Sequence, residues 1–474
     1  MNSPPFLEEL QRNPIRVEVS RAINKTSARF LDAFVDLKNF APVEEIGGLV
    51  EVACIEGQIP ADFPEGVYFR NGSNPLFGSL KSTVSVFGRS SQFWVEGEGM
   101  IQALYFKKNA WGHWTNSSKC GSFWGPNGYL SNTLIFEHSG KLYAIAENYL
   151  PQEVDISTLE TRDEWNVNGA WNRPFTSHPK KAPESGELVI MGFDAVKPYY
   201  VVGVVSADGK KLSHKVDLKF HSYNIIMDSP LTVDAKRLLV VQWFEVEPHC
   251  TFHLINCFED GNEVVERGCR SREAIIPGPD WGQDKFEWFS RGFKFTDATE
   301  TNPDSSIQDG YLFTCQLKRN LSGTELSVDF PMINEKYTGL KHKYGYTQVV
   351  DSVASSSAGF PKYHGLAKLY LDEPHPEPSQ NGGENNHLTE VESHKFAENN
   401  FCSGAAFAAK PGGSEWLACL FNEETNVGQV HIIDAKKVDS EAVAKITQPQ
   451  RVPYGFHGTF VPMPQSSKFI ALLG

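Results

Sequence analysis

The chain has 474 residues, of which 40% are hydrophobic and 12% aromatic, and its formal net charge is −14 at pH 7. This apolar content excludes disorder over most of the chain, because burying it offsets the conformational entropy lost on folding. No apolar run approaches the ~20 residues of a membrane-spanning helix, and the acidic balance argues against a nucleic-acid partner, which requires clustered Lys and Arg.

The eight cysteines are scattered along the chain, without a CxxC pair or a dense framework. Zinc knuckles and disulfide scaffolds are therefore disfavoured, and reduced cytosolic thiols are the simpler interpretation. Residues 1–25 lack an apolar segment and carry Glu8 and Glu9 among Arg and Pro, unlike a secretory signal or an acid-poor transit peptide. We expect a cytoplasmic protein, with access to a plastid surface left open.

The first predicted element is an amphipathic helix over residues 27–40, where Phe30, Leu31, Phe34 and Val35 recur at helical spacing behind a Ser start. Packing against the core is its simplest role. Contact with a membrane surface is the alternative.

Almost all of the remaining chain consists of short β-branched or aromatic runs separated by turn residues. Four such runs stand at residues 188–194, 199–205, 238–246 and 310–317. Asp-Gly pairs, which favour hairpin turns, stand at residues 208–209, 260–261 and 309–310. A stretch rich in Pro, Gly and Asn at residues 373–387 predicts one exposed loop. The pattern predicts an all-β chain.

No segment between residues 50 and 474 resembles a domain linker, so we expect the strands to close into one large unit, as a stack of sandwiches or as a propeller. A four-stranded blade takes roughly 40 to 50 residues, which leaves room for seven blades with long loops. No clear internal repeat is visible, and the blade number stays open at this level. The predicted organisation is an N-terminal segment over residues 1–44 and a single β domain over residues 45–474.

The sequence lacks the common GxSxG, GxxxxGK[ST] and HExxH enzyme signatures. Instead, four histidines stand in apolar, strand-like surroundings, namely His178, His221, His253 and His457. A buried histidine must find hydrogen-bond partners or bind a metal, and for any single one a satisfied core position is the simpler interpretation. Several neutral imidazoles without Cys or carboxylate at ligand spacing suit iron, copper or zinc and do not suit calcium.

Segments spread over residues 45–462 resemble the carotenoid cleavage oxygenases, more closely the plant carotenoid 9,10-cleavage dioxygenase and lignostilbene dioxygenase branch. In chain order, the matching segments are EGVYFRNGSNP, WVEGEGMIQALYF, LSNTLIFEHSGKLYAIAENYLP, WNRPFTSHPK, TFHLINCFEDG, DFPMINEKYTGLKHKYGYTQVV and RVPYGFHGTF. The resemblance implies a seven-bladed β-propeller capped by helices and loops, with Fe(II) held on its axis by four histidines.

Carried over by motif, three histidines match the family's iron ligands, namely His178, His253 and His457. Glu147, in AIAEN, and Asp329, in VDFP, match carboxylates that orient ligand imidazoles. A surface or capping role is the alternative for both carboxylates.

The chain departs from the family pattern at two functional positions. The segment that holds the second iron ligand in relatives is shortened here, which leaves His221 as the candidate nearby, either as a ligand or as a non-ligand beside the gap. The third orienting carboxylate of many relatives falls at Gly404, so one histidine is expected to lack that support. The chain is also shorter than the family pattern at residues 116–129 and 239–242, so a propeller with one incomplete blade is an alternative.

The resemblance implies an Fe(II)-dependent dioxygenase that cleaves a conjugated C=C bond of a carotenoid, apocarotenoid or stilbene into two carbonyl products. The expected partners are this hydrophobic small molecule and O2, with peripheral membrane contact left open. One alternative is a degenerate, catalytically impaired member that binds an apolar ligand, and the other is an isomerase or ester-cleaving member of the same superfamily. Completion of the metal site by His221 distinguishes the dioxygenase from the impaired member. Product analysis distinguishes it from the isomerase or ester-cleaving member.

Overall fold

The computed structural model describes residues 43–52, 54–74, 99–107, 113–119, 131–147, 149–193, 200–218, 250–261, 263–271, 313–316, 321–323, 326–351, 353–355, 362–371, 389–410, 413–422 and 427–462. The predicted helix at residues 27–40, the predicted loop at residues 373–387 and His221 lie outside these ranges.

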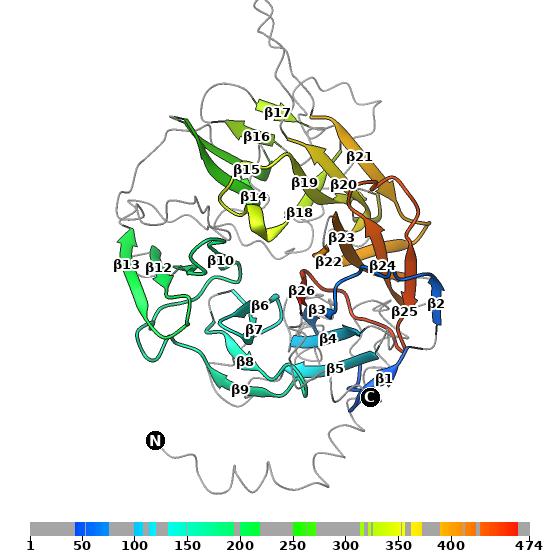
Figure 1. The fold of residues 1–474 in the computed structure, drawn as a ribbon, viewed down its shortest axis with the longest axis horizontal. Coiled ribbons are helices and arrows are strands. Elements are labelled where there is room, and N and C mark those ends of the chain that lie inside the picture. Colours follow the sequence, from blue (N-terminus) through cyan, green and yellow to red (C-terminus); the bar gives the residue numbers. More distant parts are fainter. Residues whose placement is uncertain are drawn as a thin grey trace, which may run out of the picture.

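Within these ranges, antiparallel strands form six groups of four that stand around a common centre (Figure 1). The group that joins both ends of the chain contains β26 (Gly458–Pro462), β3 (Gly66–Ser73), β4 (Gly99–Phe106) and β5 (His113–Lys119), with β1 (Val50–Glu51) at its edge. The second group contains β6 (Leu134–His138), β7 (Lys141–Ile145), β8 (Gln152–Val154) and β9 (Thr161–Glu164). The third group contains β10 (Lys180–Lys181), β11 (Leu188–Phe193), β12 (Tyr200–Val205) and β13 (Leu212–Leu218).

The other three groups follow in chain order. The fourth contains β14 (Cys250–Asp260), β15 (Glu263–Ser271), β16 (Phe313–Gln316) and β17 (Leu321–Gly323). The fifth contains β18 (Val328–Met332), β19 (Tyr344–Val350), β20 (Tyr363–Tyr370) and β21 (Val391–Lys395). The sixth, which shares a nine-stranded sheet with the fifth, contains β22 (Asn400–Lys410), β23 (Gly413–Asn422), β24 (Gly428–Asp434) and β25 (Ala444–Thr447), with β2 (Cys54–Gly57) at its edge.

The arrangement is that of a β-propeller, and the predicted all-β class is confirmed. The strands nearest the centre in Figure 1 are β26, β6, β10, β14, β18 and β22. The described residues supply six groups, so the seven blades stay a prediction. Helical structure in the described ranges is limited to the 3-10 turn η3 (Glu335–Tyr337) and residues 353–355, and the helical cap also stays a prediction. No helix among these residues has the length and apolar character needed to span a membrane.

The ring is closed by strands from the two ends of the chain. Strand β26 pairs antiparallel with β3, from Gly458 opposite Arg70 to Pro462 opposite Gly66. Strand β2 pairs in the same sense with β25. Such pairing removes strand edges that would otherwise remain open. It also places the segment before β26, which carries His457, at the centre of the ring.

Burial in the second group is greatest in a middle strand and least in the outer strand. In the second group, four of the five residues of β7 are buried, whereas all four residues of β9 are exposed. The Asp-Gly pair at 208–209 lies in the turn between β12 and β13, where Gly209 has a φ of +68°. Glycine adopts this left-handed conformation without steric cost. The side chains that pack the core therefore come mainly from inner and middle strands.

Aromatic side chains fill the space between the second and third groups. Tyr143 and Trp165 stack with their ring centroids 4.5 Å apart, and Phe136 stacks on Tyr143 at 5.3 Å. Phe175, which lies in the segment before β10, belongs to the same buried cluster. The high aromatic content of the chain thus serves the propeller core here, and it fixes the segment that leads to His178.

Candidate metal centre

Three of the four predicted histidines lie together at the centre of the ring. His253 lies on β14, and His178 and His457 lie just before β10 and β26. One nitrogen from each ring lies within 4.8 Å of the others, and the Nε2 atoms of His178 and His457 are 3.1 Å apart. His221 lies outside the described residues, so the structure does not place a fourth imidazole beside them.

The three imidazole planes are steeply inclined to one another. The interplanar angle is 79° between His178 and His253, 78° between His178 and His457, and 71° between His253 and His457. Because no two rings stack, a nitrogen of each can face the same point. Two nitrogens that bind one ion at a right angle, each at about 2.1 Å, lie about 3.0 Å apart. The 3.1 Å separation of His178 and His457 fits two ligands of one ion as well as a hydrogen bond.

His178 is connected to Glu147 through a serine hydroxyl. The Ser177 backbone N–H donates to Glu147 Oε2 at 2.8 Å, and the Ser177 hydroxyl donates to the same oxygen. Ser177 Oγ lies 3.1 Å from His178 Nδ1, whereas the carboxylate oxygen lies 4.0 Å from that nitrogen. With a proton on Nδ1, the imidazole donates to Ser177 and the lone pair of Nε2 is left for a metal.

His253 contacts a carboxylate directly. Its Nδ1 lies 2.8 Å from Asp329 Oδ1, and both side chains are nearly buried. A carboxylate at this distance accepts the Nδ1 proton and holds the ring in the tautomer that has its lone pair on Nε2. Glu147 and Asp329 therefore both lie on the side of a histidine away from the shared point.

An irregularity in β18 directs side chains toward the centre. The pairing of β18 with β19 shifts register between Asp329 and Met332, and Phe330, which lies between them, has a φ of +52°. The Phe330 ring packs against His253 at 4.6 Å and against His457 at 4.8 Å between centroids. Bulges beside functional sites re-aim side chains in this way, and a positive φ in a non-glycine residue is a strained conformation.

His457 has no carboxylate behind it in the described part of the chain, where the hydrogen bond of its side chain is the one to His178. Burial, together with the neighbouring His178, His253 and Lys180, lowers the pKa of His457 well below its usual range. A lowered pKa keeps this imidazole neutral, which is the form that binds metal.

Gly404 occupies the position where the family pattern predicts the third carboxylate. It has a φ of +134°, and a Cβ there would lie 3.2 Å from Arg70 Cγ and 3.3 Å from the carbonyl carbon of His457. The fully buried Arg70 side chain passes through this space and donates to the carbonyl of Ser403 at 2.9 Å and to Gln102 Oε1 at 2.8 Å. The space that a side chain at position 404 would need is therefore filled by a structural arginine.

Two residues of the site were not singled out in the sequence. Ser177 stands directly before His178, and a hydroxyl next to a candidate ligand is a signal that could have been used. Phe330 follows Asp329 directly, but its contact with two imidazoles depends on the register shift in β18, which the sequence pattern does not reveal.

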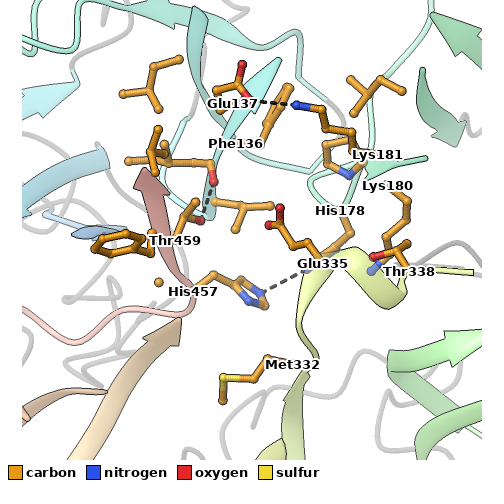
Figure 2. Close-up of a pocket in the computed structure, with 18 of the residues that line it drawn as sticks. Phe136, Glu137, His178, Lys180, Lys181, Met332, Glu335, Thr338, His457 and Thr459 are labelled. Carbon is orange, nitrogen blue, oxygen red and sulfur yellow. Dashed lines mark hydrogen bonds and ion pairs between the residues drawn. The ribbon is translucent and has the colours of Figure 1, made fainter. Parts of the chain in front are cut away.

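A cavity of about 790 Å³ reaches all three imidazoles (Figure 2). Its walls come from β6, β10, β14, β18 and β26 and extend through the second group as far as Arg162 on the outer strand β9. Thr459, next to the ligand-bearing segment, lies on this wall and donates its hydroxyl to the carbonyl of Ile135 at 2.6 Å. The three histidines are thus accessible from inside the propeller.

The sequence has relatives along nearly its whole length. It is 25% identical over 559 aligned residues to carotenoid 9,10(9',10')-cleavage dioxygenase 1 of Pisum sativum, and the alignment covers 96% of each protein. It is 26% identical to the protein of the same name from Phaseolus vulgaris, over 89% of this chain and 88% of the relative.

Solved structures show the same fold at lower sequence identity. The lignostilbene dioxygenase of Pseudomonas brassicacearum has a TM-score of 0.69 at 18% identity, and cobalt-substituted ACO of Synechocystis has a TM-score of 0.67 at 16% identity. Each comparison covers 90% of this chain and 98% of the solved chain. The sequence model of the family described as retinal pigment epithelial membrane protein, RPE65, matches residues 40–237 and 231–462. The chain therefore belongs to the family of RPE65 and the carotenoid cleavage oxygenases.

Proposed function

We propose that this protein is an Fe(II)-dependent dioxygenase that cleaves a conjugated C=C bond of a carotenoid, apocarotenoid or stilbene into two carbonyl products. The observation that carries the proposal is the cluster of three imidazoles at the propeller centre, with one nitrogen of each within 4.8 Å of the others. The named activities of the carotenoid cleavage dioxygenases and of lignostilbene dioxygenase support the substrate class.

The donor set fits a ferrous ion. Neutral imidazoles are good ligands for iron, and the contacts of His178 with Ser177 and of His253 with Asp329 hold a proton on each Nδ1. Each Nε2 then keeps its lone pair, and the lowered pKa of His457 keeps the third imidazole neutral. His221 completes the set of four in this proposal.

A ferrous ion bound at this site supplies the dioxygen chemistry that amino-acid side chains cannot perform. The reaction is balanced without an external reductant, because one O2 places one oxygen atom on each carbon of the cleaved bond. The part of the chain itself is to position the substrate and to exclude water. Phe330, packed on His253 and His457, presents an apolar face at the centre that suits a conjugated substrate.

The remaining sequence predictions belong to the same proposal. The domain is a seven-bladed propeller over residues 45–474, preceded by a segment over residues 1–44 that carries the amphipathic helix. The protein is cytoplasmic, and its hydrophobic substrate is taken up from solution or through peripheral contact with a membrane.

Metal content and products test the proposal together. The purified chain should hold close to one iron per molecule, and His253→Ala should lose it. His138→Ala is the matched control, because this buried histidine contacts the Ser206 carbonyl away from the cluster and should keep its iron. With an apocarotenoid or a stilbene under labelled O2, both carbonyl products should carry label.

Other outcomes identify the alternatives. An isomerised or ester-cleaved product without labelled carbonyls would assign an isomerase or ester-cleaving activity instead. Bound ligand without product would identify a catalytically impaired member, for which Gly404 in place of a carboxylate offers a structural reason. Absence of iron from the correctly folded chain after incubation with Fe(II) would overturn the metal centre.

A further inference from the structure

The cavity that reaches the three histidines is lined by charged as well as apolar side chains. Eight charged side chains line it, namely Glu137, Lys141, Glu153, Asp155, Arg162, Lys180, Lys181 and Glu335. Charged groups on a cavity wall can contact a hydrated cation, so this cavity offers such an ion a route to the propeller centre.

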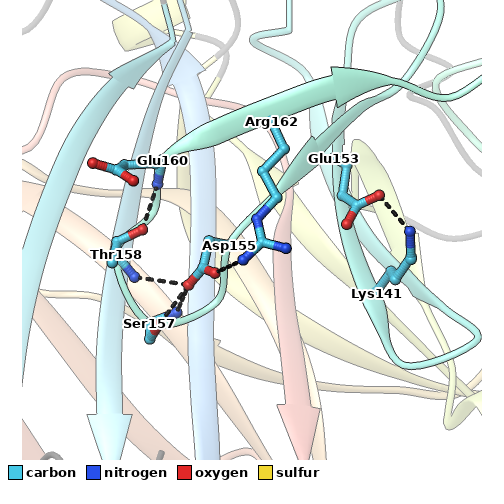
Figure 3. Close-up of polar contacts among 7 residues, drawn as sticks. All are labelled: Lys141, Glu153, Asp155, Ser157, Thr158, Glu160 and Arg162. Carbon is cyan, nitrogen blue, oxygen red and sulfur yellow. Dashed lines mark hydrogen bonds and ion pairs between the residues drawn. The ribbon is translucent and has the colours of Figure 1, made fainter.

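Most of these charges are neutralised within the cavity wall. Lys181 lies 2.9 Å from Glu137, and Lys141 lies 2.6 Å from Glu153. The third pair joins Arg162 to Asp155, whose carboxylate is also held by Ser157 and Thr158 (Figure 3). These three pairs account for six of the eight charges, and Lys180 also has a partner.

Glu335 differs from the other carboxylates of the cavity. It begins η3, which follows β18, and its side chain extends into the same cavity as His178 and His457 (Figure 2). The side chain is exposed, and it makes no hydrogen bond or ion pair with any described residue. A carboxylate so placed can be stabilised by an arriving cation.

We propose that a divalent metal ion reaches the three histidines through this cavity and that the Glu335 carboxylate draws the ion in. The inference rests on the metal centre of the proposed function. A hydrated divalent cation gives up its waters stepwise, and a hard carboxylate oxygen replaces one of them before the imidazoles do. An unpaired carboxylate also counters the repulsion from Lys180, which stands two residues after His178 and lines the same cavity.

The rate of metal uptake tests this role separately from activity. Metal-free full-length protein is mixed with excess Co²⁺ at low ionic strength, and binding is followed by the visible absorption of the imidazole-bound ion. Charged groups in a cleft change association rates by about 10- to 1,000-fold, so Glu335→Gln should slow uptake at least ~5-fold. The final stoichiometry should remain one ion per chain, and Glu335→Asp should keep most of the rate.

Glu153→Gln is the matched control, because it makes the same charge change on the wall of the same cavity at a carboxylate that is already paired with Lys141. Its uptake rate should stay within ~2-fold of the parent chain. Circular dichroism and the thermal midpoint establish that each variant is folded.

Three outcomes overturn the inference. Equal uptake rates for the parent chain and Glu335→Gln would show that the ion enters without Glu335. Equal slowing by Glu153→Gln would assign the effect to the general field of the cavity. Failure of the folded parent chain to take up Co²⁺ at all would remove the metal centre itself, and with it this inference, whereas the first two outcomes leave the metal centre intact.

Discussion

Glu147 reaches His178 through a hydroxyl group, whereas Asp329 contacts His253 directly. The carboxylate of Glu147 lies 4.0 Å from the nearest imidazole nitrogen, and Ser177 bridges the gap with contacts to both groups. The serine hydroxyl has one proton, which it donates to the Glu147 carboxylate. Its oxygen is then left to accept the proton on Nδ1 of His178, so the three groups form one hydrogen-bonded chain. Removal of either Ser177 or Glu147 breaks the same connection.

We therefore predict that Ser177→Ala and Glu147→Gln weaken metal binding by similar factors, each about 10-fold, within the range found when partners of metal-bound histidines are removed. The double variant should bind no more weakly than the single ones, because the two residues act as one unit. Competition with a chelator, using Co²⁺ as the probe, measures the affinities.

Asp329→Asn provides the comparison for the Ser177 and Glu147 variants. It acts on His253, so its effect should multiply that of Glu147→Gln. Independent, multiplicative losses for Ser177→Ala and Glu147→Gln would contradict the relay and would assign each residue a separate role.

At the scale of elements, an irregular segment and not a strand holds His178. The Trp171 side chain is buried and donates its Nε1–H to the carbonyl of Pro174 at 3.2 Å, and its ring packs edge-on against Phe175. Gly203 makes room for it, because a Cβ there would lie 2.6 Å from the Trp171 ring. The segment is thus fixed by aromatic packing before it reaches His178.

Trp171→Ala should lower the free energy of unfolding by about 3–5 kcal/mol, the usual cost of removing a buried aromatic side chain. It should also weaken metal binding by the folded protein, because the anchor of the His178 segment is lost. Urea unfolding and chelator competition measure the two effects.

Phe396→Ala is the control for that variant. Phe396 is buried in a different cluster, against Ile433 and Leu366 among others. A comparable loss of stability with unchanged metal affinity is expected. If both variants lose metal affinity equally, the effect of Trp171 is one of global stability and not of positioning.

At the scale of the whole molecule, buried histidines outside the metal centre make stability depend on pH. Burial lowers the pKa of His431 to about 3, with smaller contributions from Lys445 and His394. Its Nδ1 has no hydrogen-bond partner among the described residues. Burial also lowers the pKa values of His138, His364 and His394. All four side chains bind protons more readily in the unfolded chain than in the folded one.

The metal-free protein should therefore lose stability as the pH falls below about 6.5, the pKa of an unfolded histidine. Because the unfolded state binds more protons there, each such group contributes up to about 1.4 kcal/mol per pH unit. The contribution of His431 should continue to fall until about pH 3. The lowered pKa of Asp155, about 2, adds a further loss only at more acidic pH.

Urea unfolding at pH 7.5, 6 and 5 measures this dependence. His431→Gln should flatten it, whereas His214→Gln, at an exposed position on β13, should leave it unchanged. A pH profile that is the same for the parent chain and His431→Gln would refute the assignment.

The sequence by itself determined the all-β class, and its resemblance to a known family indicated the three histidine motifs that meet at the centre and the two carboxylates behind them. These features are readable because they depend on local properties. Short β-branched and aromatic runs form strands wherever they stand, the Asp-Gly pair at 208–209 turns the chain, and each histidine lies within a motif of contiguous residues. The lack of a third carboxylate, at Gly404, was expected from the resemblance, and the structure shows that this position lies beside His457.

Only the tertiary structure decided how these parts meet. The pairing of β26 with β3, the bridging place of Ser177, the contact of Phe330 with two imidazoles and the position of Glu335 in the cavity all join segments distant in sequence. Side-chain periodicity repeats along each strand and carries no information on which strands become neighbours. That choice, and with it the 2.8 Å contact of Asp329 and the hydroxyl-bridged contact of Glu147, follows from closing and packing the ring.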